Sequence, residues 1–481
     1  MSSEIDKSNI AHWLNYVTTL NYLHIDTEHI KDEDLIGMIK KFITALFVLV
    51  ILGVNSIPTA ATVGFEKNTD NAFNLLGIVD SDVLEEVEDI LSKRFNTSIK
   101  IASIFQLSEP ERRNLILRIR LKDLSSLIPK SLIFKQAIRK EDAVEDKDSF
   151  NKFIREVAGL TFLSGLEKTQ YYVPQLYGYS VRYQFVLVED FGEKHVSLVD
   201  SLTNGDFDEA RVSLERFMIR LGQLHGESYQ QKDKYLQILQ AIHVDVPTLH
   251  NDFESTFREV SPKLELLLKR INLPYTTRTQ SEVNMVIKSV LETSPFLTFT
   301  HGDGCPDNVF DDPASNQLRL IDFESSFLRS ALLDAVYLRM SMPTCWCAKS
   351  IPEELIESCE QIYRQELMKH ISESKDDESY YTNYIYACAF WMLKSLAYAE
   401  EVLDQDIVWF TGYLPKTSLW NPAINLAQPR VLSRLEAFIL VSKKYDKLPH
   451  IRFMAEQVLR TLKDRWHYTK PMSMYPSFSA Q

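Results

Sequence analysis

One short span of the chain gathers side chains that can bind a metal ion or move a proton. The segment HGDGCPDNVFDDPASNQLRLIDFE, residues 301–324, holds one histidine, five aspartates and one glutamate. Carboxylate oxygens are ligands that suit Mg²⁺, and a carboxylate within reach of a hydroxyl accepts its proton. The span therefore indicates a metal site, a proton-transfer site or, in the simplest interpretation, a run of ordinary turn residues.

The order of apolar and polar residues in this span predicts a β-hairpin. FLTFT enters as a strand, NVF and QLRLIDF have the composition of two arms, and DDPASN is the turn between them. The hairpin brings Asn308, at the start of one arm, close to Asp322, at the end of the other, and Asp303 lies on the loop before them. We expect these three side chains to converge and to suit Mg²⁺. Asp311 and Asp312 are interpreted as turn formers.

The spacing of these residues matches a kinase pattern. His301-Gly-Asp303 followed by Asn308 keeps the H-x-D-x-x-x-x-N spacing of the kinase catalytic loop, and Asp322-Phe-Glu324 stands at the place of the D-F-G metal site. In this H-G-D and I-D-F-E form, the span resembles the aminoglycoside phosphotransferase and choline-kinase-like family of small-molecule kinases, including ecdysteroid-kinase-like relatives.

The resemblance implies a role for each of these residues. Asp303 is expected to accept the proton of the acceptor hydroxyl, and His301 is expected to fix the loop around it. Asn308 and Asp322 are expected to hold Mg²⁺. The implied reaction transfers the γ-phosphate of ATP to a hydroxyl group of a small molecule, with ATP and Mg²⁺ as cofactors.

Residues upstream of the span extend the resemblance. SLIFKQ is similar to the third strand of the small lobe, with Lys135 as the nucleotide lysine and Lys130 as its rival. FIRE supplies Glu156 on the following helix, where it would hold that lysine. FVLVEDFG is similar to the edge strand that enters the hinge, so Glu189 and Phe191 are expected to line the nucleotide site.

Together, the resemblance and the pattern of elements predict an α+β, bilobal, protein-kinase-like fold. We expect residues 71–190 to form a small lobe with an antiparallel sheet and one helix inserted after its third strand. Residues 191–481 should form a large, mainly helical lobe that carries the catalytic loop 301–324. Residues 1–70 have the pattern of a helical extension. Amphipathic segments predict helices in the large lobe at 208–228, 251–270, 353–371, 378–403 and 430–442.

Two departures from the kinase pattern bear on function. Gly302 stands where regulated protein kinases have an arginine that receives a phosphate, which favours a small-molecule kinase over a protein kinase. The turn QLSEPERRN between the first two strands has no glycine, although a close approach of backbone to phosphates favours glycine. Ser108, Arg112 or Arg113 are the candidates to contact the nucleotide there instead.

One further motif has the letters of a metal site in the wrong place. Asp190-Phe191-Gly192 spells D-F-G, but it precedes His301, whereas the metal aspartate must follow that histidine. We interpret it as part of the hinge. The aspartate of LLDAVYL, Asp334, resembles one that braces the catalytic loop in the family, and a plain helix N-cap is the alternative.

Composition excludes some classes of partner and compartment. The formal net charge of −13 and the absence of a basic run argue against a nucleic-acid partner. The five cysteines form no repeated pair, so a structural zinc site is disfavoured and buried reduced thiols are expected. Reduced thiols, together with a need for cytosolic ATP, predict a cytoplasmic protein. The cysteines are Cys305, Cys345, Cys347, Cys359 and Cys388.

One apolar segment leaves the location open. No charged residue occurs from Phe42 to Phe65, and the strongly apolar part, residues 42–54, is shorter than a spanning helix needs. A packed helix, a membrane anchor and a signal segment that begins near Met38 all remain possible. Association with a membrane through residues 42–54 is therefore an open expectation.

Three functions compete on this sequence. The first is the phosphotransferase, and the second is a pseudokinase that keeps the fold as a binding or scaffold module, which the glycine-free turn favours. A metal-dependent hydrolase is the third, and it leaves Lys135 and Glu156 unexplained. The sequence fits several classes of acceptor. Aromatic residues that belong to the core or to an acceptor pocket gather near the C-terminal helices: Trp391, Tyr398, Trp409, Phe410, Tyr413 and Trp420, with Asp404 and Asp406 beside them.

Overall fold

The computed structural model describes most of the chain beyond its N-terminal part. The described residues are 79–108, 113–122, 127–138, 143–167, 171–193, 196–242, 252–312, 315–408 and 425–479. The predicted helical extension, residues 1–70, and its apolar segment, 42–54, lie outside them. Within these ranges, no helix has both the length and the apolar character that are required to cross a membrane.

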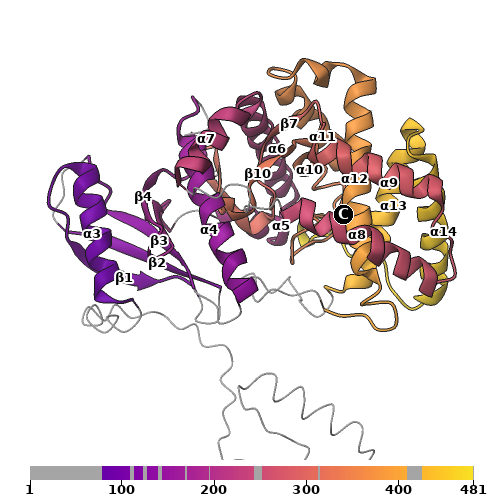
Figure 1. Cartoon of the computed structure of the whole chain (residues 1–481), viewed down its shortest axis with the longest axis horizontal. Helices are drawn as coiled ribbons and strands as arrows, with labels where there is room; N and C mark the ends of the chain where they lie inside the picture. The colour runs from indigo at the N-terminus through magenta and orange to yellow at the C-terminus, as the bar shows by residue number, and fades with distance from the viewer. Residues whose placement is uncertain are drawn as a thin grey trace, which may run out of the picture. The chain divides into compact units, whose positions relative to one another are not determined.

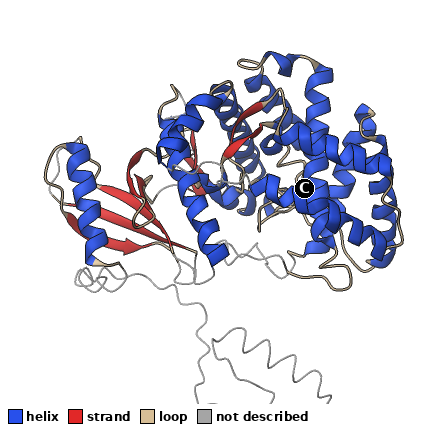
Figure 2. Ribbon diagram, in the orientation of Figure 1, coloured by secondary structure: helices blue, strands red, loops and turns tan. Residues whose placement is uncertain are grey.

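The small lobe is a five-stranded antiparallel sheet with two helices (Figure 1, Figure 2). Its spatial order is β1-β2-β3-β5-β4, so the first three strands form a meander and the last two a hairpin. As predicted, one helix is inserted between β3 and β4. The elements are α3 (Ser81–Phe95), β1 (Ile101–Gln106), β2 (Asn114–Leu121), β3 (Ser131–Ala137), α4 (Ala143–Ser164), β4 (Leu176–Ser180) and β5 (Phe185–Glu189).

The alternation of side chains along β3 decides on which face of the sheet Lys135 lies. Leu132 and Phe134 are fully buried in the small-lobe core, where they meet Leu117 of β2 and Val87 of α3. Successive side chains of a strand point to opposite faces. Lys135 therefore points away from this core, toward the face on which α4 lies. One residue of shift in register would place the lysine in the apolar cluster.

The large lobe is mostly helical, and all five predicted helices are present with ends that differ by a few residues. Three further helices of eleven residues or more, α7, α9 and α14, were not predicted. The helices are α5 (Leu198–Thr203), α6 (Phe207–Ser228), α7 (Lys232–Ile242), α8 (Asp252–Arg270), α9 (Thr277–Leu291), α10 (Leu332–Ala335), α11 (Glu353–Leu367), α12 (Asp377–Ala399), α13 (Ala427–Tyr445) and α14 (Pro449–Arg465).

Two small sheets interrupt the helices and carry the predicted hairpin. The strands β8 (Val309–Asp312) and β9 (Gln317–Leu320) pair antiparallel, with Val309 opposite Leu320. Both arms of the hairpin are therefore confirmed. The short strand β6 (Val196–Ser197) joins the edge of β8. The strand β7 (Leu297–Thr300) enters the catalytic loop and pairs with β10 (Phe327–Ser330).

The interpretation of Asp311 as a turn former is wrong. Asp311 lies within β8, on the same face as the buried Val309, and is itself fully buried. Its carboxylate accepts hydrogen bonds from Ser213 (2.6 Å) and from the guanidinium of Arg216, both on α6. A buried carboxylate is stable only when it is paired. The sequence pattern missed this because the partners lie about a hundred residues away along the chain.

We predict that Asp311→Ala destabilises the protein by about 3 kcal/mol, because it leaves the Arg216 guanidinium without its carboxylate. Asp312→Ala, one residue further along the same strand, is the matched control and should cost less than about 1 kcal/mol. Chemical denaturation of both variants measures the free energy of unfolding. Equal losses for the two variants would contradict the assignment.

Candidate active site

The register of the hairpin brings the two halves of the span together at one end. The backbone N–H of Ile321 donates to the carbonyl of Asn308 (3.0 Å), so the residues next to Asp322 lie against the start of β8. A 3₁₀ turn, Pro306–Asn308, connects the catalytic loop to that strand. The amide nitrogen Nδ2 of Asn308 donates to the carbonyl oxygen of Asp303 (3.1 Å) and to its Oδ2 (3.3 Å). The predicted convergence of Asp303, Asn308 and Asp322 is therefore present.

His301 is an internal support of the loop. The imidazole is buried, and its Nδ1 accepts from the backbone N–H of Asp303 (3.3 Å). Its Nε2 lies 2.8 Å from the carbonyl of Ile321, which fits a neutral ring with the proton on Nε2. Burial lowers the pKa of His301 and so favours that neutral form. The ring links the catalytic loop to the strand that leads into Asp322.

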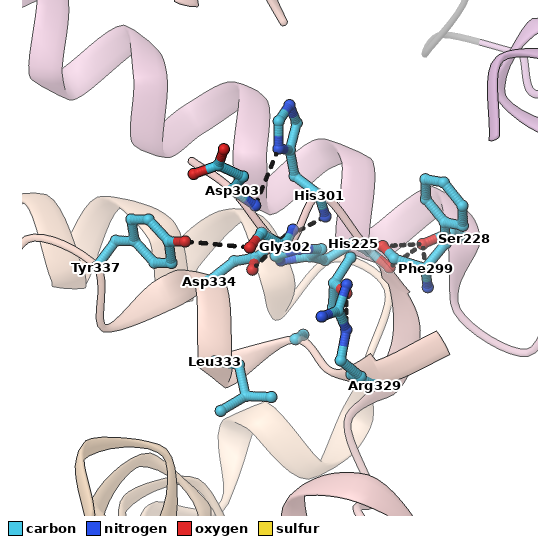
Figure 3. Close-up of polar contacts among 12 residues, drawn as sticks. His225, Ser228, Phe299, His301, Gly302, Asp303, Arg329, Leu333, Asp334 and Tyr337 are labelled. Carbon is cyan, nitrogen blue, oxygen red and sulfur yellow. Dashed lines mark hydrogen bonds and ion pairs between the residues drawn. The ribbon is translucent and has the colours of Figure 1, made fainter. Parts of the chain in front are cut away.

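Asp334 holds the loop from below, as Figure 3 shows. Its Oδ2 accepts from the backbone N–H of His301 (2.7 Å), and both oxygens lie 3.3 Å from the N–H of Gly302. His225 of α6 lies 3.3 Å from the same carboxylate. Burial would raise the pKa of Asp334, but the hydrogen bond from His225 and nearby positive charge hold it below its ordinary value. The prediction that Asp334 braces the catalytic loop is confirmed, and the N-cap alternative is wrong.

Lys135 lies at the centre of a cluster of carboxylates from both lobes. Its Nζ is 2.8 Å from Glu156 Oε2, 2.5 Å from Asp322 Oδ1 and 3.5 Å from Glu324 Oε2. Burial alone would lower the pKa of Lys135, but the three carboxylates, Asp322 foremost, raise it above its ordinary value. Lys135 is thus a permanent cation. Its rival Lys130 is exposed.

Glu324 is a site residue to which the sequence analysis gave no role. It is buried and accepts from Arg113, just before β2, and from Nδ2 of Asn114 (3.3 Å), the first residue of β2. Burial would raise the pKa of Glu324, but the charges of Lys135 and Arg113 hold it below its ordinary value. The only sequence signal for Glu324 was its position directly after the phenylalanine of the I-D-F-E motif.

Oxygen atoms suited to a hard cation lie together here. One carboxylate oxygen from each of Glu156, Asp322 and Glu324 falls within 4.8 Å of the others. All are hard donors of the kind that Mg²⁺ prefers. The backbone of Asp322 is left-handed, with φ 65°, which turns its carboxylate from the strand toward Lys135. A shallow recess opens beside the cluster; Arg113, Asn114, Lys135, Ala137, Ser149, Lys152, Phe153, Glu156 and Glu324 line it.

Asp303 has the environment of a proton acceptor. Burial, with a smaller contribution from the neighbouring carboxylates of Asp307, Asp322 and Glu324, raises the pKa of Asp303 to about 7, although the hydrogen bond from Thr344 acts to lower it. A carboxylate with a pKa near neutral is a much stronger base than an ordinary aspartate. The sequence carried no signal for Thr344.

The hinge residues make contacts between the lobes. Glu189 pairs with Arg319 of β9 (2.8 Å), and the Arg319 guanidinium lies 4.4 Å from the centre of the Phe191 ring. Asp190, from the literal D-F-G, accepts from Arg118 (2.7 Å) and Ser131 (2.7 Å) within the small lobe. Asp190 is therefore a structural residue of the hinge.

At the glycine-free turn, Ser108 supports the strand itself. Its hydroxyl accepts from the backbone N–H of Ile116 (3.0 Å), and its own N–H bonds the Ile116 carbonyl (3.3 Å). Arg112 lies outside the described residues. Of the two described candidates for contact with the nucleotide, Ser108 and Arg113, Arg113 lines the recess.

The cysteine prediction is wrong for two of the five residues. Cys305, in the catalytic loop, and Cys345 form a disulfide, with Cα atoms 5.0 Å apart. The pair was missed because its members are 40 residues apart and match no spaced motif. Cys347, Cys359 and Cys388 are free and buried. Cytoplasmic localisation stays a prediction, but the argument from five reduced thiols no longer supports it.

Of the aromatic residues expected at the acceptor pocket or the core, those described lie in or against the core. Trp391 is buried and donates to the Leu333 carbonyl (2.9 Å), and Tyr398 packs against the core. Asp404 pairs with Arg270 (2.6 Å), and Asp406 caps α13. The other predicted members lie outside the described residues: Trp409, Phe410, Tyr413 and Trp420.

Comparison with known families agrees with this geometry. The model of the ecdysteroid kinase-like family matches residues 115–375, more than half of the chain. The chain belongs to the ecdysteroid kinase-like family. The matched region of this family member begins on β2 and ends after α11, so it contains Lys135, Glu156 and the catalytic loop. The predicted resemblance and the bilobal kinase-like fold class are confirmed. No curated protein matches the chain.

Several solved structures resemble this ecdysteroid kinase-like protein at low sequence identity. An ethanolamine kinase from Plasmodium vivax is 13% identical, with a TM-score of 0.38, over 79% of this chain and 96% of that one. Choline kinase LicA from Streptococcus pneumoniae is 14% identical, with a TM-score of 0.35, over 74% and 99%. A macrolide 2′-phosphotransferase type I is 15% identical, with a TM-score of 0.34, over 68% and 93%.

The catalytic loop requires glycine at one of its two glycine positions. Gly302 has φ +79°, and a Cβ there would collide with Arg329 and with the carbonyl of Ser325. We predict that Gly302→Ala lowers the free energy of unfolding by about 1–3 kcal/mol. At Gly304 a Cβ would meet Phe217 and Tyr337 at ordinary contact distance, 3.4 Å. Gly304→Ala is therefore the control and should change stability by less than about 1 kcal/mol. Thermal and chemical denaturation decide, and an unaffected Gly302→Ala would be inconsistent with the loop geometry.

Proposed function

We propose that this protein is an ATP- and Mg²⁺-dependent phosphotransferase that phosphorylates a hydroxyl group of a small molecule. One observation carries the proposal. Lys135, from the small-lobe sheet, meets Glu156 and Asp322 at the place where the catalytic loop presents Asp303. Phosphoryl transfer asks the protein mainly for positioning and for neutralisation of charge, and these residues supply both.

Each residue has a defined part in this proposal. Lys135, held by Glu156, binds phosphate oxygens of ATP. Asp303 accepts the proton of the attacking hydroxyl while the new bond from oxygen to the γ-phosphorus forms and the bond to the ADP oxygen breaks. Asp322 and Glu324, whose carboxylate oxygens lie within 4.8 Å of one another, would hold Mg²⁺ together with Asn308 at the start of the hairpin. The ion would supply positive charge to the phosphates.

The acceptor proposed first follows from the family. The family model is named for ecdysteroid kinases, so a polyhydroxylated steroid of the ecdysteroid class is the first acceptor to test. The net charge of −13 further supports a small molecule over a nucleic acid as the partner. A panel of hydroxyl-bearing metabolites and aminoglycosides, assayed by release of ADP, covers the other acceptor classes.

Asp303→Asn should lower kcat for release of ADP by about 10²–10⁴-fold, because the amide cannot accept the proton. The variant is nearly isosteric, so stabilisation of the protein by MgATP should remain. Asp312→Asn, in the same hairpin but outside the site, should keep wild-type kcat. Full activity of Asp303→Asn in a steady-state assay would show that another group is the base.

Removal of Mg²⁺ should distinguish the role of Asp322 from the roles of the other site residues. MgATP at 100 times its dissociation constant should stabilise the wild type by about 2.7 kcal/mol, seen as a rise in Tm. Asp322→Asn should lose most of the part that depends on Mg²⁺, and its shift with ATP and a chelator should equal that of the wild type. If the variant responds to Mg²⁺ as the wild type does, the metal assignment is wrong.

A binding module without turnover is the second candidate. The observation in its favour is that the cations of the recess already have partners: Lys135 pairs with Asp322, Arg113 with Glu324 and Lys152 with Asp148. In this case the ion pairs would be permanent. Stabilisation by MgATP favours the phosphotransferase, and the lack of any shift at millimolar MgATP favours the scaffold.

A further inference from the structure

One segment of the large lobe lies along the catalytic loop and contacts three of its residues. Thr344 Oγ1 donates a hydrogen bond to Asp303 Oδ1. Cys345 forms the disulfide with Cys305. Trp346 Nε1 donates to an oxygen of Asp307, 2.9 Å away. Three consecutive residues, 344–346, thus contact three alternate residues of the catalytic loop: 303, 305 and 307. We call residues 344–346 the clasp.

The first contact of the clasp reaches the proposed base itself. Thr344 bonds one carboxylate oxygen of Asp303, and Asn308 bonds the other at 3.3 Å. Held at both oxygens, the carboxylate cannot rotate freely about its terminal torsion. The hydroxyl of Tyr337 lies 2.8 Å from Thr344 Oγ1 and 3.2 Å from the carbonyl of Gly302. Because Thr344 donates its own proton to Asp303, Tyr337 shares its proton between Thr344 Oγ1 and that carbonyl, and so holds Thr344 in place.

The clasp is anchored to the core of the large lobe. Two arginines of α13, both buried, donate to backbone carbonyls of the clasp and of the residues before it. Arg430 bonds the carbonyls of Cys345 and Trp346, each at 2.6 Å, and Arg434 bonds the carbonyl of Met340 at 3.0 Å. Hydrogen bonds from charged donors are stronger than neutral ones. The position of the clasp is therefore set by α13, independently of the catalytic loop.

We propose that the clasp is a positioning element for phosphoryl transfer, in which Thr344 orients Asp303 and the Cys305–Cys345 bridge ties the two loops together covalently. This proposal rests on the function proposed above. Thr344 touches no reacting atom, so it is a positioning residue. Its loss lets the carboxylate turn away from the acceptor hydroxyl without changing the sites of ATP or Mg²⁺.

The bridge makes this positioning sensitive to reduction. A small dithiol would reduce the Cys305–Cys345 bond with two electrons and two protons, yielding two thiols and the oxidised, cyclic disulfide of the reagent. Cys347 places a third sulfur 2.7 Å from Cys345 Sγ. Peptide mapping of the unreduced protein must therefore decide which sulfurs are joined, and a bridge between Cys345 and Cys347 would overturn the assignment.

The first experiment compares two substitutions of one residue. Thr344→Val removes the hydroxyl at nearly constant volume, and Thr344→Ser keeps it. Thr344→Val should lower kcat for ADP release by at least about tenfold, the worth of one hydrogen bond to a charged group. KM for MgATP should stay within about twofold, and Thr344→Ser should restore most of kcat. Thr382→Val, on the outer part of α12, is the control.

The assay uses MgATP alone, where water is the acceptor, and MgATP with an ecdysteroid. Wild-type kcat in Thr344→Val, or an equal loss in Thr344→Ser, would overturn the role of Thr344. If the wild type releases no ADP under either condition or with any acceptor of the panel, the proposed function fails, and the positioning role fails with it. Active wild type with unaffected variants overturns the positioning role alone.

The second experiment tests the bridge in the full chain. Mapping should recover a Cys305–Cys345 cystine, and reduction should lower kcat of the wild type by more than about threefold without loss of the MgATP thermal shift. The double variant Cys305→Ala/Cys345→Ala should have a low kcat that reductant does not change. Cys359→Ala, a buried free cysteine elsewhere, should respond as the wild type does. Free thiols at both positions in the native protein, or a kcat that is indifferent to reduction, would overturn the covalent tie.

Discussion

The buried cluster around Lys135 is the interaction on which the rest of the structure depends. One cation from the small-lobe sheet meets Glu156 of the inserted helix and Asp322 and Glu324 of the large lobe. Charges removed from water are costly unless each is paired, so the lobes must present these groups to one another. The alternation of side chains along β3, the left-handed backbone at Asp322 and the register of the hairpin together bring these charged side chains into contact. Three carboxylates against Lys135 and Arg113 also leave an excess of negative charge, which suits the entry of a divalent cation.

The catalytic loop is held by a set of internal contacts that are in place without a ligand. Asp334 accepts from the backbone at His301 and Gly302, His301 bonds Ile321, and Asn308 bonds Asp303. Each of these bonds fixes backbone or orients a side chain, and none requires a ligand. A preorganised loop of this kind spends no free energy on rearrangement when substrate arrives. Together with α13, the fold positions one aspartate from several directions.

Much of the fold and of the candidate site could be predicted from the sequence, and the predictions that failed share one physical cause. Local signals predicted the small-lobe sheet, its inserted helix, the hairpin and the motif residues, because strand alternation, turn chemistry and spaced motifs are properties of neighbouring residues. Asp311, Thr344 and the Cys305–Cys345 pair were missed or misread because their partners lie 40 to about 100 residues away. Glu324 was visible as a letter of the motif, but its contact with Arg113 depends on how the lobes meet. Only the tertiary fold brings such residues together.

The contact between Arg113 and Glu324 has a consequence for how a nucleotide would enter. Arg113 lies just before β2 in the small lobe, and Glu324 lies in the large lobe. Their ion pair, which we call the latch, therefore joins the two lobes beside the recess. An incoming phosphate exchanges one anion for another at the same guanidinium, and the number of ion pairs changes little. Dissolved salt weakens the latch and the complex alike. Under the proposed function, the affinity for a nucleotide should therefore vary less with ionic strength than it would at an open cluster of cations.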